Sequence, residues 1–140
     1  MSYQRADRKL AIDLLSEARD SIVAGWTQHG PAADAEGRPM LDVRRAAAWS
    51  PIGALQLACI RRELAWSDVT TATAVRALQI ACVGENRPSD LTVACCDIAN
   101  ANDLLERASG QAVVLRWFTT AIGVVTKSLQ PSRRAAGGAR

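Results

Sequence analysis

One internal stretch of this sequence, from Gly25 to Pro39, interrupts a pattern that otherwise predicts one helix after another. It begins Gly-Trp-Thr-Gln and ends Asp-Ala-Glu-Gly-Arg-Pro. Asp is favoured at the first position of a type I turn, and Gly adopts the left-handed conformation that often follows such a turn. We therefore expect Asp34 to Gly37 to form the tip of a short, irregular hairpin. Pro31 and Pro39 limit its pairing, because proline lacks an amide proton.

The rest of the chain carries apolar residues at helical spacing. Pro51 suits a first helical position with Ser50 as the cap before it, and Asp42 suits the cap of a short helix. The sequence predicts an all-α fold, a compact bundle of five or six helices with a short β-hairpin or loop insert at residues 26–41 and no β structure elsewhere. The expected helices span residues 5–24, 43–49, 52–65, 68–83, a segment capped by Ser89, and 111–129, with a short helical turn at 104–108.

Helical spacing also indicates which side chains face the core. Trp117 shares a stripe with Val114 and Val125, so we expect it to be mostly buried. Thr70, Thr71, Thr73, Arg76 and Gln79 are expected to face outward from the helix that carries Val75 and Leu78.

A length of 140 residues indicates a single helical domain, residues 1–130, followed by a flexible basic tail, residues 131–140. The formal net charge is +3, and much of the excess lies at the end, in Arg133, Arg134 and Arg140. The body is then close to neutral, whereas a nucleic-acid-binding fold usually shows a denser basic face. The tail contains no apolar residue larger than alanine, which is typical of an unpacked segment.

The four cysteines, Cys59, Cys82, Cys95 and Cys96, all lie among apolar residues in helical patterns, so we expect them to be reduced core residues. None is spaced as paired zinc ligands are, and the sequence predicts no metal and no cofactor. The polar start carries no apolar signal segment, and the apolar run 112–125 is short and interrupted by Arg116. These features favour a cytoplasmic protein without a membrane segment.

Three motifs together resemble a small bacterial and bacteriophage family of unknown function. They are Gly-Trp-Thr-Gln at residues 25–28, Asp-x-x-Gly-Arg-Pro at 34–39, and Gly-Ala-Leu at 53–55. The resemblance runs from about residue 14 to residue 122, and it includes an Asn-Asp pair, Asn102-Asp103, before the last helix. The family usually has Trp ahead of that pair, where this chain has Ala101. The resemblance implies a helical architecture and brings no activity.

Candidate binding-surface residues come from the non-helical stretch and its surroundings. Tryptophan and arginine are enriched at interface anchors, and the candidates are Trp26, Gln28, His29, Arg38 and Trp49, with Arg133, Arg134 and Arg140 in the tail. The alternative is structural, with Trp26 holding the hairpin on the helical core and the polar groups facing water. His29 is the single histidine, and no nucleophile or orienting partner can be assigned to it, so no catalytic residue is predicted.

The sequence favours a non-enzymatic accessory protein that binds another protein or a second copy of itself. One alternative is a nucleic-acid-associated factor that uses the basic tail. Another is an uncharacterised enzyme with a site around His29 and Arg38.

Overall fold

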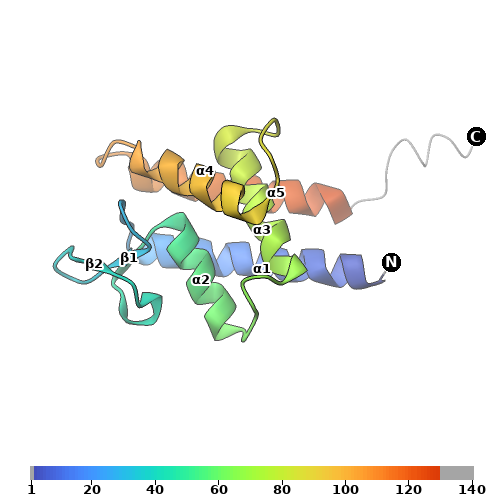
Figure 1. Ribbon diagram of the computed structural model, residues 1–140, viewed down its shortest axis with the longest axis horizontal. Coiled ribbons are helices and arrows are strands. Elements are labelled where there is room, and N and C mark those ends of the chain that lie inside the picture. The colour runs from blue at the N-terminus through green and yellow to red at the C-terminus, as the bar shows by residue number, and fades with distance from the viewer. Residues whose placement is uncertain (1, 130–140) are drawn as a thin grey trace, which may run out of the picture.

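A computed structural model describes residues 2–129, and these residues form five α-helices and a small sheet (Figure 1). The expected architecture, a compact helical fold with a β insert after the first helix, is confirmed. The helices are α1 (Ser2–Ala24), α2 (Pro51–Arg61), α3 (Val69–Val83), α4 (Leu91–Asp103) and α5 (Gly110–Leu129).

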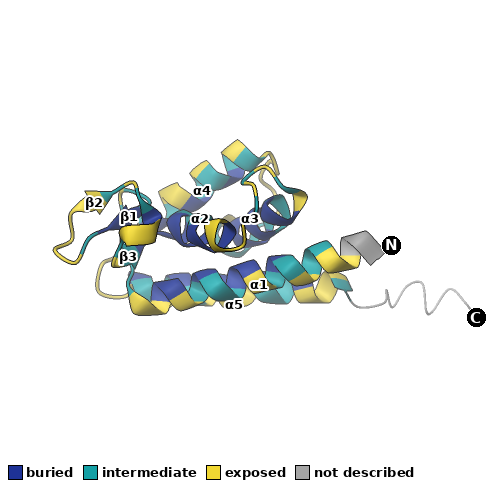
Figure 2. Ribbon diagram, turned by 90° about the horizontal axis from the view of Figure 1, so that it is seen from below, coloured by how far each residue is buried: buried dark blue, intermediate teal, exposed yellow. Residues whose placement is uncertain are grey.

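The first and last helices lie side by side and antiparallel, and together they form one layer of the molecule (Figure 2). The amide of Gln111 donates to the Ile22 carbonyl, and the Arg8 guanidinium donates to the Ser128 carbonyl, so each end of α1 meets one end of α5. The other three helices pack on one face of this pair, with α3 in contact with α1, α4 and α5. The start of α1 and the end of α5 therefore lie at the end of the molecule opposite the sheet (Figure 1).

The sheet has three very short strands, β1 (Ala32–Ala33), β2 (Pro39–Met40) and β3 (Ala48–Trp49), in the order β2-β1-β3 with antiparallel pairing. The hairpin turn forms as predicted: the Gly37 amide donates to the Asp34 carbonyl over 3.0 Å, and Gly37 has a φ of +81°.

Strand β3 corrects two expectations, because it lies outside residues 26–41 and within the segment expected to be a short helix. That segment contains only a 3₁₀ turn, η1 (Val43–Arg45), capped by Asp42 as predicted. The chain then extends, since the Ala47 amide donates to the Ala33 carbonyl and the Trp49 amide to the Gly25 carbonyl. Pairing with residues distant in sequence overrides the helical preference of an alanine run.

Caps define most helix ends. The Ser50 hydroxyl accepts from the Gly53 amide at the start of α2, where Pro51 is the first helical residue. Helix α4 is capped by Asp90 rather than Ser89, because the Asp90 carboxylate reaches the amides of the first turn. The expected helical turn at 104–108 is a non-helical loop.

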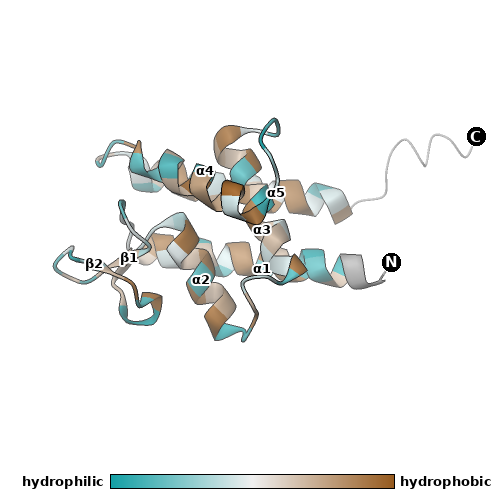
Figure 3. Cartoon of the chain, viewed as in Figure 1, coloured by the Kyte–Doolittle hydropathy of each residue, from teal (hydrophilic) through white to brown (hydrophobic). Residues whose placement is uncertain are grey.

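The core lies between the layers and draws on every helix (Figures 2 and 3). Helix α5 contributes Phe118, Val114 and Val125 to the buried core. Trp117 packs against the margin of the core and is mostly, though not fully, buried, as expected. Phe118, the next residue, lies about 100° further round the helix and takes the central position.

Three side chains expected on the outer face of α3 are instead buried: Thr70, Thr71 and Gln79. Each polar group has a partner. The Thr71 hydroxyl donates to the Ala65 carbonyl, and the Gln79 amide donates to the Pro88 carbonyl and to Asp97, both over 2.9 Å. Hydrogen bonds to neighbouring loops offset the cost of burying these groups.

Among the described residues, α5 is long and apolar enough by length and composition to cross a bilayer. Core helices of soluble proteins often meet that criterion as well, and α5 packs along α1 and α3.

Candidate functional site

The Gly-Trp-Thr-Gln motif joins the end of α1 to the end of α4. The indole N–H of Trp26 donates to the Asn102 side-chain oxygen over 2.8 Å, and the Asn102 amide donates to the Thr27 carbonyl over 3.0 Å. Asn102 is only 1% exposed, whereas Trp26 and Thr27 are partly exposed, so both hydrogen bonds are partly buried. The motif and the Asn-Asp pair, which are far apart in sequence, form one structural unit.

Gln28 adds further hydrogen bonds to this contact between the loop after α1 and the end of α4, which we call the join. Its side-chain amide donates to the carbonyls of Asn102 and Leu105, each over 2.8 Å. The Asn102 carbonyl lies in the last turn of α4, where it also accepts from the backbone amides of the following residues, and the Leu105 carbonyl lies just beyond the helix. Gln28 therefore ties the loop after α1 to the end of α4 and to the start of the loop that follows it.

His29 lies at the edge of the join, in a left-handed conformation with a φ of +63°. Its backbone amide donates to the Asp103 carboxylate over 2.8 Å, and its ring Nδ1 lies 3.7 Å from the other carboxylate oxygen. The imidazole is 72% exposed, so the structure gives this histidine a backbone anchor and a solvent-facing ring.

Two glycines make room for the join. A Cβ on Gly110, at the start of α5, would overlap the Trp26 ring, and a Cβ on Gly25 would overlap the Ala47 carbonyl. The first turn of α5 and strand β3 therefore approach the Gly-Trp segment more closely than any other residue would allow.

Arg38 lies at the tip of the hairpin, away from this join. Its backbone amide and its Nε both donate to Asp34, over 2.8 and 2.9 Å. These hydrogen bonds, the backbone one first, hold the pKa of the Asp34 carboxyl below its usual value. The ion pair is exposed and contributes little to stability, so its main effect is on the shape of the turn.

Trp49 belongs to the core. Its indole N–H donates to the Val43 carbonyl over 2.7 Å, which ties β3 to η1. Of the predicted surface, the structure thus brings Trp26, Gln28 and His29 together at the end of α4. The Trp49 backbone also lies beside Trp26, because the Thr27 amide donates to the Trp49 carbonyl and the Trp49 amide to the Gly25 carbonyl, whereas Arg38 lies apart at the hairpin tip. Arg133, Arg134 and Arg140 lie outside the described residues.

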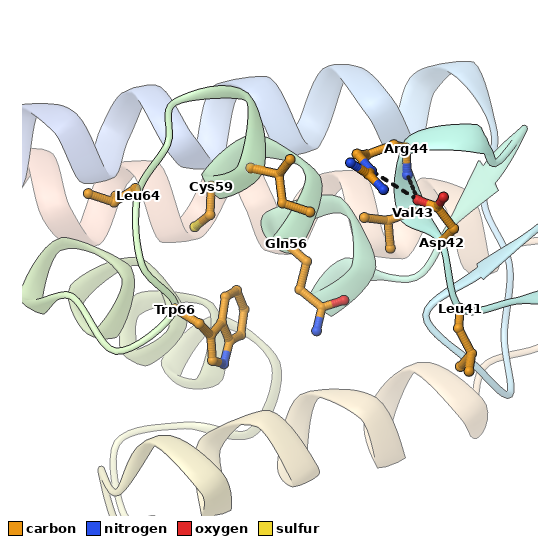
Figure 4. Close-up of a pocket in the computed structure, with 9 residues that line it drawn as sticks. Leu41, Asp42, Val43, Arg44, Gln56, Cys59, Leu64 and Trp66 are labelled. Carbon is orange, nitrogen blue, oxygen red and sulfur yellow. Dashed lines mark hydrogen bonds and ion pairs between the residues drawn. The ribbon is translucent and has the colours of Figure 1, made fainter.

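The sequence did not indicate an apolar groove of about 610 Å³ between η1, α2 and the loop that follows α2 (Figure 4). We refer to it as the α2 groove. Val43 and Cys59 line it, and Gln56 extends into it between Trp66 and Leu41 (Figure 4). Its remaining lining residues are Asp42, Arg44, Ile60 and Leu64.

Large apolar side chains of the α2 groove are open to solvent. Leu41 is 89% exposed and Ile60 is 47% exposed. In the sequence they stand as a single leucine after the hairpin and an isoleucine near a helix end. No pattern marks them, because single exposed apolar residues are common on any protein. What distinguishes these two is that both border the same groove as Trp66.

Two arginines lie beside one carboxylate at the edge of the α2 groove: Arg44 lines the groove, and Arg45 lies just outside its lining. Asp42 accepts from Arg44 over 3.2 Å and lies 3.7 Å from the Nε of Arg45. Hydrogen bonds from Arg44, first from its side chain and then from its backbone amide, lower the pKa of the Asp42 carboxyl. Two guanidinium groups share this one carboxylate, and only that of Arg44 lines the groove.

The thiols differ in environment, although all four were expected in the core. Cys59 is buried and burial raises its pKa; burial also raises the pKa of Cys82 to about 12 and that of Cys95 to about 11. Cys96 is exposed, which corrects the expectation for that residue, because it lies about 100° round α4 from Cys95. Thiols with raised pKa values are protonated at neutral pH and are poor nucleophiles.

No family model, curated protein or solved structure matches this chain. The resemblance to a bacterial and bacteriophage family therefore remains a prediction from the motifs. Within residues 2–129, no group of three or more His, Cys, Asp and Glu side chains is arranged to hold a metal ion.

Proposed function

We propose that the protein is a non-enzymatic accessory protein that binds a partner protein through the α2 groove. The observation that carries the proposal is the exposure of Leu41 and Ile60 on a groove walled by Trp66. Burying exposed apolar side chains releases about 25 cal/mol per Å², and an aromatic wall is typical of interface anchors. A partner side chain seated there would cover both residues.

The charge at the edge of the groove selects the partner's chemistry. Arg44 lines the groove and Arg45 lies beside it, and both share Asp42, so this edge favours an acidic residue beside the partner's apolar anchor. We therefore assign to the groove an amphipathic peptide segment that carries a large apolar side chain and an Asp or Glu next to it.

The two alternative functions have less support from the described residues. His29 and Arg38, the centre of the enzymatic alternative, are engaged by different carboxylates, Asp103 and Asp34. The nucleic-acid alternative depends on the arginines of the tail, which lie outside the described residues.

Selection of a displayed random peptide library on the full-length chain tests this function. We expect enriched peptides to combine Leu, Ile, Phe or Trp with an acidic neighbour. Leu41→Asp should reduce binding of a selected peptide at least tenfold, because it replaces an exposed apolar contact at the edge of the groove with a charge. Leu104→Asp is the matched control, since Leu104 is 85% exposed and does not line the α2 groove.

Replacing both Arg44 and Arg45 with Gln should remove the preference for acidic residues while apolar anchors are still selected. Peptides that bind Leu41→Asp as tightly as the unmodified chain would place the partner surface elsewhere. Enrichment of basic peptides would contradict the proposed charge preference.

A further inference from the structure

A second hollow, of about 410 Å³, is lined by residues of α1, α3 and α5. Its lining includes Arg8, near the start of α1, and Ser128, near the end of α5, and these two helix ends lie away from the sheet (Figure 1). Its walls are mainly apolar, and they include Val69, Ile80, Val124 and Val125. Val69 is 61% exposed although it faces this hollow. Two arginines, Arg8 from α1 and Arg76 from α3, also line it.

Neither arginine has a carboxylate partner in the part of the chain that the structure describes. The Arg8 guanidinium donates to the Ser128 carbonyl over 2.8 Å, and the neighbouring Asp7 instead lies 3.4 Å from the Thr70 hydroxyl. A carbonyl satisfies an N–H donor but does not neutralise the cation. Arg8 therefore brings a half-buried positive charge to the border of the hollow.

Arg76 is also bonded to neutral acceptors alone. Its Nη1 donates to the Gln79 side-chain oxygen over 2.7 Å and to the Arg87 carbonyl over 3.0 Å, and its Nη2 donates to the Glu85 carbonyl over 2.9 Å. The nearby carboxylate of Asp97 is taken by Arg87 and Gln79. Since a guanidinium has five N–H donors, Arg76 keeps donors for a further acceptor.

Half-burial of a cation without a counter-ion is costly, and an anion entering the hollow would offset that cost. Guanidinium groups match the oxygens of carboxylates and phosphates in particular. The apolar walls favour a hydrocarbon chain, and the volume falls within the range of small-molecule sites, about 300–1,000 Å³.

We propose that this hollow binds a single-chain amphiphilic anion, with a carboxylate or phosphate head held by Arg8 or Arg76 and an apolar chain lying on the valines of α3 and α5. The site is separate from the α2 groove and does not depend on the function proposed for that groove.

Calorimetric titration of the full-length chain tests the proposal with decanoate and decyl phosphate below their micelle concentrations. We expect one bound anion per chain for at least one of the two, and the stronger of them identifies the head group. Decanol, which has the chain without the charge, should bind at least tenfold more weakly, and inorganic phosphate, which has the charge without the chain, should bind more weakly than decyl phosphate.

Arg8→Gln should weaken binding about tenfold if Arg8 holds the head, and Arg76→Gln should do so if Arg76 holds it. Arg76 also ties the loop after α3, so Ala72→Asp, which puts a negative charge on the wall, provides a second test that keeps those bonds. Arg107→Gln is the control and should leave binding unchanged, since Arg107 is exposed and does not line the hollow. The proposal is overturned if neither anion binds, if decanol binds as well as the anions, or if Arg8→Gln, Arg76→Gln and Ala72→Asp all bind like the unmodified chain.

Discussion

At the residue scale, the Asn102 side chain determines how the first loop meets α4. It is almost completely buried, and its oxygen and its amide are each used once, by Trp26 and by Thr27. A buried acceptor that loses its donor pays the cost of its lost hydration in full. Trp26 and Asn102 are therefore coupled: replacing either residue leaves the polar group of the other without its hydrogen-bond partner.

Trp26→Phe is expected to lower the free energy of unfolding by about 1–3 kcal/mol, because it keeps most of the ring and removes the N–H that Asn102 accepts. Urea unfolding measures the change. Trp66→Phe is the matched control, since the Trp66 indole makes no hydrogen bond within residues 2–129 and should lose less. Equal losses in the two variants would mean that ring size, not the hydrogen bond, sets the cost.

At the scale of elements, glycine determines how closely helix and loop approach. A Cβ on Gly53 in the first turn of α2 would overlap the Pro31 carbonyl, which is backbone and cannot turn aside. Gly123 in the middle of α5 has no atom within 4 Å of the same position. Glycine is thus needed in α2, where the backbone of another segment lies against it, but not at position 123 of α5, where a side chain would fit.

Gly53→Ala should destabilise the protein by about 1–3 kcal/mol, as overpacking does. Gly123→Ala should stabilise it by up to about 1 kcal/mol, because alanine is the better residue in a helix interior. Thermal unfolding of the two variants should therefore shift in opposite directions. A stable Gly53→Ala variant would show that α2 can move away from the loop at little cost.

Local signals were enough to predict several elements. The Asp34–Gly37 turn and the Ser50-Pro51 helix start are confirmed because their hydrogen bonds close within a few residues. Strand β3 was missed because its partners, Gly25 and Ala33, are distant in sequence, while its own alanines favour helix.

The site was harder to predict than the fold for the same reason. Trp26 and Asn102 lie 76 residues apart, and no local pattern reports that they meet. Leu41 and Trp66 are single residues in loops, and only the packing of α2 between them creates a groove. Burial of Gln79 also depends on a loop carbonyl and on Asp97, neither of which its helix pattern contains.

At the scale of the whole molecule, one core holds the helices together, and within residues 2–129 its buried members lie between Ala11 and Val125. Deleting residues 132–140 should therefore leave the unfolding temperature and the binding of a selected peptide unchanged. Differential scanning calorimetry and titration of both forms measure this. If the tail instead binds nucleic acid, truncation will weaken that binding and reduce its salt dependence by up to about three phosphate contacts.

The antiparallel pairing of α1 with α5 also sets an order of events during synthesis. The ribosome makes α1 first and α5 last, yet these two helices form one layer of the molecule. A nascent chain that ends before residue 110 exposes the buried stripe of α1 where α5 would cover it. Folding of this protein is therefore completed only after the last helix has left the exit tunnel, and until then that stripe is open to chaperones and to other nascent chains.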